Sequence, residues 1–132
     1  MEKVVLDSYP VLALLYNEKG AEKIEKTIRD VLKKNGRIFM CAVNYGEVFY
    51  AVMRKSGEKA ALKAVEMIEE IPVEIIDADR NMSLIAGSYK VKHKMSYADC
   101  FTAALAKILS VPIVTGDPEF QEVEKEIKII WV

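Results

Sequence analysis

Short apolar runs alternate along the chain with longer stretches in which apolar residues recur every three or four positions. The short runs are rich in Val and Ile, which is typical of buried strands, and the longer spacing is typical of amphipathic helices. Because no hairpin signal joins two successive runs, the alternation predicts a parallel sheet covered by helices on both faces. The predicted strands span residues 4–7, 38–43, 73–76, 113–115 and 127–132.

Capping residues and breakers divide the stretches between the strands into helices. Ser8 is the predicted N-cap of the first helix, Asn44 opens the third and Ser96 starts the sixth. The sixth helix is apolar on nearly all sides, so we expect it at the centre of the fold. The predicted helices run from Ser8 to about residue 17 and then over 21–34, 44–55, 58–71, 80–92 and 98–109. These elements predict a single domain, residues 1–132, built as a three-layer α/β/α sandwich around a mainly parallel, five-stranded sheet.

Four carboxylates stand where predicted strands give way to helices. Asp7 closes the first strand, Asp117 follows the fourth by two residues, and Glu47 and Asp99 lie in the first turns of predicted helices. Ligands bind at the carboxyl ends of the strands in open α/β sheets, so we expect the four acids to meet there. Four acids in one pocket repel each other and cannot all stay ionised without a cation. The arrangement therefore indicates a hard divalent metal and phosphate chemistry.

Each of the four acids also fits a purely structural role at a helix end or a turn. These roles are an N-cap for Asp7, the capping partner of Asn44 for Glu47 and of Ser96 for Asp99, and a turn residue for Asp117. The occurrence of all four at matching positions in an α/β order favours a shared site over four separate caps.

Residues next to the acids in the sequence carry side chains that could support the site. Ser8 and Thr115 place hydroxyls beside Asp7 and Asp117, where they can orient a carboxylate or bind a metal-bound water. Glu119 is either a fifth, peripheral acid or a solvated glutamate favoured by the start of a helix.

The charge balance limits how the chain can hold a nucleic acid. The formal net charge is −1, so attraction of phosphates must be local or must run through a metal. The best local candidates for phosphate contacts form a basic stretch, which can equally be a solvated helix end. This stretch comprises Lys90, Lys92, His93 and Lys94. Since His93 is the only histidine, a nuclease mechanism that uses a histidine pair is excluded.

Cysteine usage and hydropathy point to the cytoplasm. Cys41 and Cys100 form neither a CxxC pair nor a metal-ligand pattern, and we expect two buried thiols. No apolar run approaches the roughly 20 residues needed to cross a bilayer.

Four aromatic or flexible side chains either belong to the core or form an apolar patch for a partner helix. They are Tyr16, Phe49, Tyr50 and Met53.

Four segments of the chain resemble the PIN domain, and the similarity is greatest to the VapC-type toxins of prokaryotic toxin–antitoxin pairs. The segments are LDSYPVLALL, NYGEVFYAVMRK, MSYADCFTAALAK and PIVTGDPEF, and the resemblance spans nearly the whole chain. It implies that Asp7, Glu47, Asp99 and Asp117 form the acidic quartet of the family, with Ser8 and Thr115 at its hydroxyl positions. It further implies Mg²⁺ or Mn²⁺ as cofactor, RNA as substrate, homodimers, and inhibition by a small VapB-like antitoxin.

The resulting hypothesis is a metal-dependent endoribonuclease. Asp7, Asp99 and Asp117 would hold one or two Mg²⁺ or Mn²⁺ ions, and Glu47 would be a further ligand or the base for the attacking water. Two alternatives remain open: a non-catalytic PIN-like scaffold that binds RNA or protein, and an RNA-maturation nuclease. A receiver domain and a phosphatase with a DxD nucleophile fit poorly, because Ser8 and Tyr9 follow Asp7.

Overall fold

The computed structural model describes residues 2–132, and its centre is a five-stranded sheet with the strand order β3-β2-β1-β4-β5. Every neighbouring pair of strands is parallel. The strands are β1 (Lys3–Leu6), β2 (Arg37–Cys41), β3 (Val73–Ile76), β4 (Ile113–Thr115) and β5 (Ile129–Trp131). The predicted parallel sheet is therefore confirmed.

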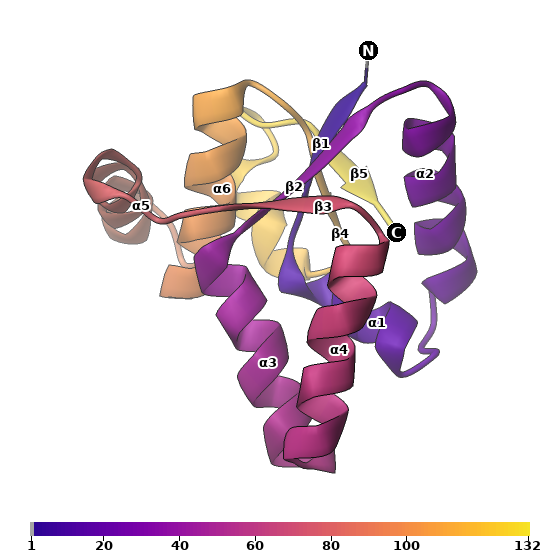
Figure 1. The fold of residues 1–132 in the computed structure, drawn as a ribbon. Helices are drawn as coiled ribbons and strands as arrows, with labels where there is room; N and C mark the ends of the chain where they lie inside the picture. Colours follow the sequence, from indigo (N-terminus) through magenta and orange to yellow (C-terminus); the bar gives the residue numbers. More distant parts are fainter. Residues whose placement is uncertain (1) are drawn as a thin grey trace.

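Helices cover both faces of this sheet and give three layers (Figure 1). One face packs against α1 to α4, and the other packs against α5, α6 and the 3₁₀ helix η1. The helices are α1 (Ser8–Leu15), α2 (Ala21–Lys33), α3 (Ala42–Ser56), α4 (Glu58–Glu70), α5 (Arg80–Lys92), α6 (Tyr97–Leu109) and η1 (Pro118–Val123). Helices α3 and α4 extend beyond one end of the strands, which Figure 1 shows below the sheet.

Alternating side chains of the strands supply two cores, one on each face. Val4 and Leu6 of β1 join the core under α1 to α4, whereas Val5 joins the core under α5 and α6. Successive residues of a strand point to opposite faces, so an unbroken apolar strand serves both cores. Helix α6 has eight buried residues, which confirms its expected central position.

Most element bounds agree with those predicted, and the differences lie at the ends. β3, β4 and α5 have the predicted bounds. Helix α3 begins at Ala42, two residues earlier than expected, and Val43 in its first turn packs against the core under α6. β5 begins at Ile129, since the N–H of Ile127 bonds to the carbonyl of Val123 and continues the turn of η1. Helix α1 begins at Ser8, so Asp7 takes the N-cap position predicted for Ser8.

Two further expectations can be compared with the fold. Cys41 and Cys100 are both buried free thiols, as expected. Within residues 2–132, the helices are all too short or too polar to span a membrane.

Candidate metal centre

The carboxyl ends of β1 and β4, the second turn of α3 and the first turn of α6 bring the predicted acids together. Carboxylate oxygens of Asp7, Glu47 and Asp99 lie within 4.8 Å of one another. A second group, Asp99, Asp117 and Glu119, meets the same limit and shares Asp99 with the first. We call these five residues the acidic centre.

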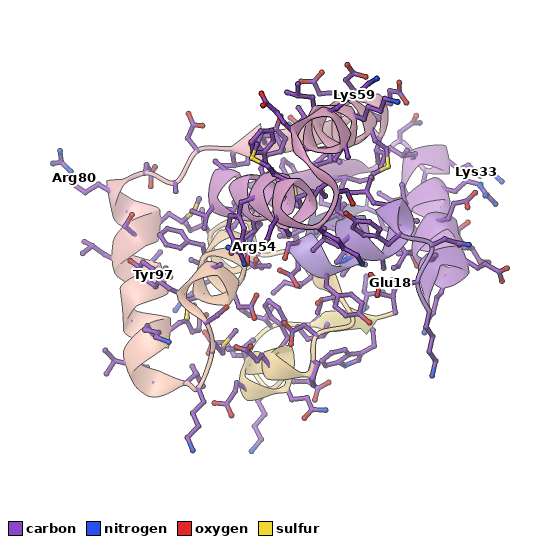
Figure 2. All side chains as sticks on the ribbon, turned by 90° about the horizontal axis from the view of Figure 1, so that it is seen from below. Glu18, Lys33, Arg54, Lys59, Arg80 and Tyr97 are labelled. Atoms are coloured by element: carbon purple, nitrogen blue, oxygen red, sulfur yellow. The ribbon has the colours of Figure 1, made fainter. Side chains whose placement is uncertain are left out.

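Figure 2 shows this end of the molecule from below, with Arg54 of α3 and Tyr97 of α6 between the outer positions of Arg80 and Lys33. Tyr97 begins α6, two residues before Asp99. Four separate segments of the chain therefore contribute to the acidic centre: the end of β1, the start of α3, the start of α6 and the turn after β4.

The side chain of Asp7 is held by hydroxyl groups, and no ion pair within residues 2–132 involves it. Its side chain is only 1% exposed. Thr115 donates from Oγ1 to Oδ2 at 3.0 Å, and the Oγ1 of Thr102 lies 3.4 Å from Oδ1. Asp7 occupies the N-cap position of α1, but its side chain makes no capping bond, so the capping explanation for Asp7 is wrong.

Thr115 and Gly116 shape the turn that carries Asp117. The hydroxyl of Thr115 donates to Asp7 and accepts the backbone N–H of Asp117 at 3.0 Å, so one side chain links both acids. A Cβ atom at position 116 would overlap the ring of Tyr9 and lie 2.9 Å from the carbonyl of Val132. Glycine is therefore required for this close approach.

Glu47 is oriented by Asn44, but not through a helix cap. Because α3 begins at Ala42, Asn44 is the third residue of the helix and Glu47 is in its second turn. The Nδ2 of Asn44 donates to Glu47 Oε1 at 3.1 Å and to the carbonyl of Ala98 at 3.1 Å. The predicted capping role of Asn44 is therefore wrong, since its amide is used by side chains and by a neighbouring helix.

Asp117 combines a position in the acidic centre with the turn role that the sequence indicated. The predicted capping bond from the Asp99 carboxylate to the N-cap amide is wrong, because the N–H of Ser96 donates to Glu119 Oε1. The N–H of Asp99 donates to Ser96 Oγ at 3.1 Å, so Ser96 is the N-cap of α6. Asp117 caps η1 by accepting the N–H of Glu119 at 2.9 Å. A capping bond and a position in the acidic centre are thus compatible for Asp117.

Burial and mutual repulsion make two of the acids hard to ionise. Burial, with smaller contributions from Glu47 and Asp117, raises the pKa of Asp7 to about 7. Burial, and then the charges of Asp7, Asp117 and Glu119, raise the pKa of Asp99 to about 9. Five carboxylates that converge without an ion-pair partner among residues 2–132 form the all-oxygen donor set that suits a hard divalent cation. The residues present therefore fit such an ion.

Glu119 and Glu122 fasten the loop between α5 and α6. Glu119 is half-buried rather than solvated, and its Oε1 accepts the N–H of Ser96 at 2.6 Å. Glu122, which the sequence did not indicate, accepts the N–H of Lys94 at 3.2 Å and lies 3.3 Å from His93 Nδ1. The two glutamates hold the loop that leads into α6, and thus support the position of Asp99.

The basic stretch before α6 is divided between structural and exposed side chains. Lys90 donates to the carbonyl of Met95 at 2.7 Å, and His93 faces Glu122. Lys92 and Lys94 are exposed. Their contact with RNA stays a prediction.

Sequence reasoning missed one buried polar residue near the acids. Thr102 is fully buried in α6 and donates to Asn44 Oδ1 at 2.8 Å. The available signal was a single hydroxyl in an otherwise apolar run of the helix. That signal did not reveal the partner, which lies 58 residues earlier in the chain.

Comparisons with known proteins give a consistent result. The profile of the family described as "PIN domain" matches residues 4–126. The chain is 23% identical to ribonuclease VapC30 of Mycobacterium tuberculosis over 129 residues, which cover 92% of this chain and 95% of that protein. It is also similar to the structure of VapBC2 from Rickettsia felis bound to a promoter DNA fragment, with a TM-score of 0.78, 16% identity and 97% of each chain covered. A third similar structure is VapC20 of Mycobacterium tuberculosis, a toxin that cleaves the sarcin-ricin loop, with a TM-score of 0.73, 15% identity, and 89% of this chain and 92% of that chain covered.

Proposed function

Because the chain belongs to the PIN domain family, we propose that it is a metal-dependent endoribonuclease of the VapC toxin type. The observation that carries the proposal is the acidic centre, in which five carboxylates from four segments converge at the carboxyl edge of the sheet. Such mutual repulsion is unfavourable in a protein that binds no cation there. The similarity to a ribonuclease over nearly the whole chain supports the same activity.

Asp7, Asp99 and Asp117 are the proposed metal ligands, either directly or through water. Asp99 belongs to both groups of acids, so the spacing suits one or two ions. Mg²⁺ and Mn²⁺ are the proposed ions because both accept all-oxygen ligand sets. A bound divalent cation would supply the Lewis acid that lowers the pKa of water and neutralises charge on the phosphate.

The residues of the chain then orient the reaction. Glu47 Oε1 accepts a hydrogen bond from Asn44, which leaves the other oxygen to take the proton of the attacking water or to bind the ion. Thr115 fixes the direction of the Asp7 carboxylate. Because water is the proposed nucleophile, the products carry 5′-phosphate and 3′-hydroxyl ends.

Side chains around the acidic centre are suited to contact single-stranded RNA. Tyr9 and Tyr97 are exposed beside Asp7 and Asp99, where their rings can stack on unpaired bases. Lys92 is an exposed residue of the basic stretch at the end of α5 and a candidate for phosphate contact.

A small VapB-like antitoxin is the proposed protein partner, and a homodimer in the cytoplasm is the proposed state of the toxin. A similar structure, VapBC-5 of Mycobacterium tuberculosis, is described as a member of a family of toxin-antitoxin systems, which supports such a partner. Tyr50 and Met53 on α3 are exposed, whereas Phe49 and Tyr16 are half-buried. An apolar antitoxin helix packed against these side chains would cover the exposed part of α3.

Cleavage of single-stranded RNA by the purified protein tests the proposed activity. We expect cleavage with Mg²⁺ or Mn²⁺, none with EDTA, and a loss of at least about 100-fold in kcat/KM for Asp99→Asn, because a proposed ligand is removed. Asp30→Asn is the matched control, since Asp30 is exposed on α2 and pairs with Lys26. Cleavage by Asp99→Asn at the wild-type rate, or products that end in 2′,3′-cyclic phosphate, would show the proposal to be wrong.

A further inference from the structure

Asn44 and Thr102 form a buried polar bridge between α3 and α6. Both side chains are 0% exposed. Thr102 Oγ1 donates to Asn44 Oδ1 at 2.8 Å, while Asn44 Nδ2 donates to the carbonyl of Ala98 at 3.1 Å. Burying an amide and a hydroxyl requires desolvation that an apolar pair of similar shape would avoid. Core packing alone therefore does not explain why these two polar side chains are buried together.

The hydroxyl of Thr102 is directed away from its own helix. A threonine inside a helix commonly bonds to the carbonyl four residues earlier. Thr27 of α2 does so, donating to the carbonyl of Lys23 at 2.8 Å. For Thr102 the equivalent carbonyl is that of Ala98, which instead accepts from Asn44. The amide of Asn44 thus bonds to both the hydroxyl of Thr102 and the carbonyl of Ala98, two groups of α6 that could otherwise bond to each other.

Hydrogen-bond directions fix which way round the Asn44 amide lies. The carbonyl of Ala98 and the carboxylate of Glu47 can only accept, so both must face Nδ2. Oδ1 then faces Thr102, whose one hydroxyl proton goes to it at 2.8 Å rather than to Asp7 Oδ1 at 3.4 Å. Without this hydroxyl, Asn44 Oδ1 would be buried without a hydrogen-bond donor. Turning the amide over would not help, because Oδ1 would then face the carbonyl oxygen of Ala98 and the carboxylate oxygen of Glu47.

The fixed amide is aimed at Glu47. Asn44 and Glu47 are three residues apart in α3 and lie on the same face of the helix. The bond from Nδ2 to Glu47 Oε1 keeps this carboxylate near Asp7 and Asp99, although like charges repel it. The donor is neutral, so it orients Glu47 without cancelling the negative charge that a cation requires.

We propose that Asn44, locked by Thr102, is a positioning residue that holds Glu47 in the acidic centre before any ion binds. This inference deepens the proposed function and rests on it. Groups that orient metal-binding side chains in this way typically contribute 10- to 100-fold to metal affinity or activity. Loss of the Thr102 hydroxyl should therefore weaken both, although Thr102 belongs to neither group of clustered acids.

Thr102→Val removes the hydroxyl while preserving the shape, and Thr102→Ser retains it. Thr27→Val is the matched control, because it removes a helical threonine hydroxyl on another helix. Titration calorimetry with Mn²⁺ alone measures affinity, RNA cleavage measures kcat and KM, and thermal melts confirm folding. We expect Thr102→Val to weaken Mn²⁺ binding about tenfold and to lower kcat with KM for RNA unchanged. Thr102→Ser and Thr27→Val should both behave like the wild type.

A Thr102→Val protein that melts earlier but binds Mn²⁺ with wild-type affinity would show the bridge to be merely structural and overturn the inference. If the bridge acts through Glu47, adding Thr102→Val to a Glu47→Gln protein should cause no further loss of Mn²⁺ affinity. A further loss as large as the one that Thr102→Val causes in the wild type would contradict this route. Thr102→Ala takes its place should the valine variant not fold. Failure of the wild type to cut RNA overturns the proposed activity, whereas unchanged Mn²⁺ affinity overturns this inference alone.

Discussion

The carboxylates of this protein occupy two opposite electrostatic settings. On the surface of α2, Asp30 lies 2.8 Å from the ammonium of Lys26, and the hydrogen bond to this lysine lowers the pKa of Asp30. In the acidic centre, burial and neighbouring carboxylates raise the pKa of Asp7 and of Asp99. The surface acid is thus compensated within the chain, and the buried acids are not.

The difference shows where the chain retains repulsion that folding alone would avoid. In residues 2–132, no ion pair involves Asp7, Glu47, Asp99 or Asp117. Replacing the buried acids by neutral residues would remove the repulsion, so keeping them lowers the stability of the metal-free protein. Such a loss of stability is common where a site is shaped for function. A cation from solution should therefore do for the acidic centre what Lys26 does for Asp30.

The largest expected effect is stabilisation by Mn²⁺. An ion that binds only the folded state raises the free energy of unfolding by about 2.7 kcal/mol at 100 times its dissociation constant. That gain corresponds to a rise in Tm of roughly 10 °C for a chain of this size. Thermal melts with and without Mn²⁺ measure it. Asp7→Asn should abolish most of the rise, and an equal rise in this variant would mean that the ion binds elsewhere.

A second effect is expected from pH in the absence of metal. The pKa values of Asp7, about 7, and Asp99, about 9, lie above the ordinary 3.8, so the folded state holds these protons longer than the unfolded state. Between pH 5 and 9 the folded state therefore binds more protons, and the free energy of unfolding falls as pH rises. Urea unfolding at several pH values in EDTA measures this slope.

Asp99→Asn is the variant that tests the origin of the pH slope. It removes the acid with the larger shift in pKa, so it should flatten the fall and make the metal-free protein more stable than the wild type at pH 9. If the pH slope of Asp99→Asn equals that of the wild type, other groups cause the slope. The contrast between the buried acids and the surface acid would then be wrong.

The sequence predicts the acidic centre well because its geometry follows from topology. Once Asp7 and Asp117 are placed after parallel strands, both must lie at the carboxyl edge of the sheet. Regular apolar patterns also predict β3, β4 and α5 with their observed bounds. These features depend on local periodicity and on the direction of the strands, which a single sequence contains.

The Asn44–Thr102 bridge was not predictable because each partner has a satisfactory local explanation. Asn44 followed by Glu47 fits a capping pattern, and Thr102 fits a buried helix position. The choice between a cap and a bridge depends on α3 beginning at Ala42 and on α6 lying against it. The start of α3 and its contact with α6 depend on tertiary packing, which the local sequence pattern does not specify.

The smallest expected effect belongs to the surface pair. Asp30→Asn removes an exposed ion pair between residues four apart on α2, and such pairs contribute little because water and salt screen them. We expect a change in Tm within about 1 °C, with the Mn²⁺ effect and the pH slope unchanged. Thermal melts at low and high salt measure the change. A fall in Tm comparable to the rise caused by Mn²⁺ would contradict the contrast, since compensation at the surface would then matter as much as compensation in the buried acidic centre.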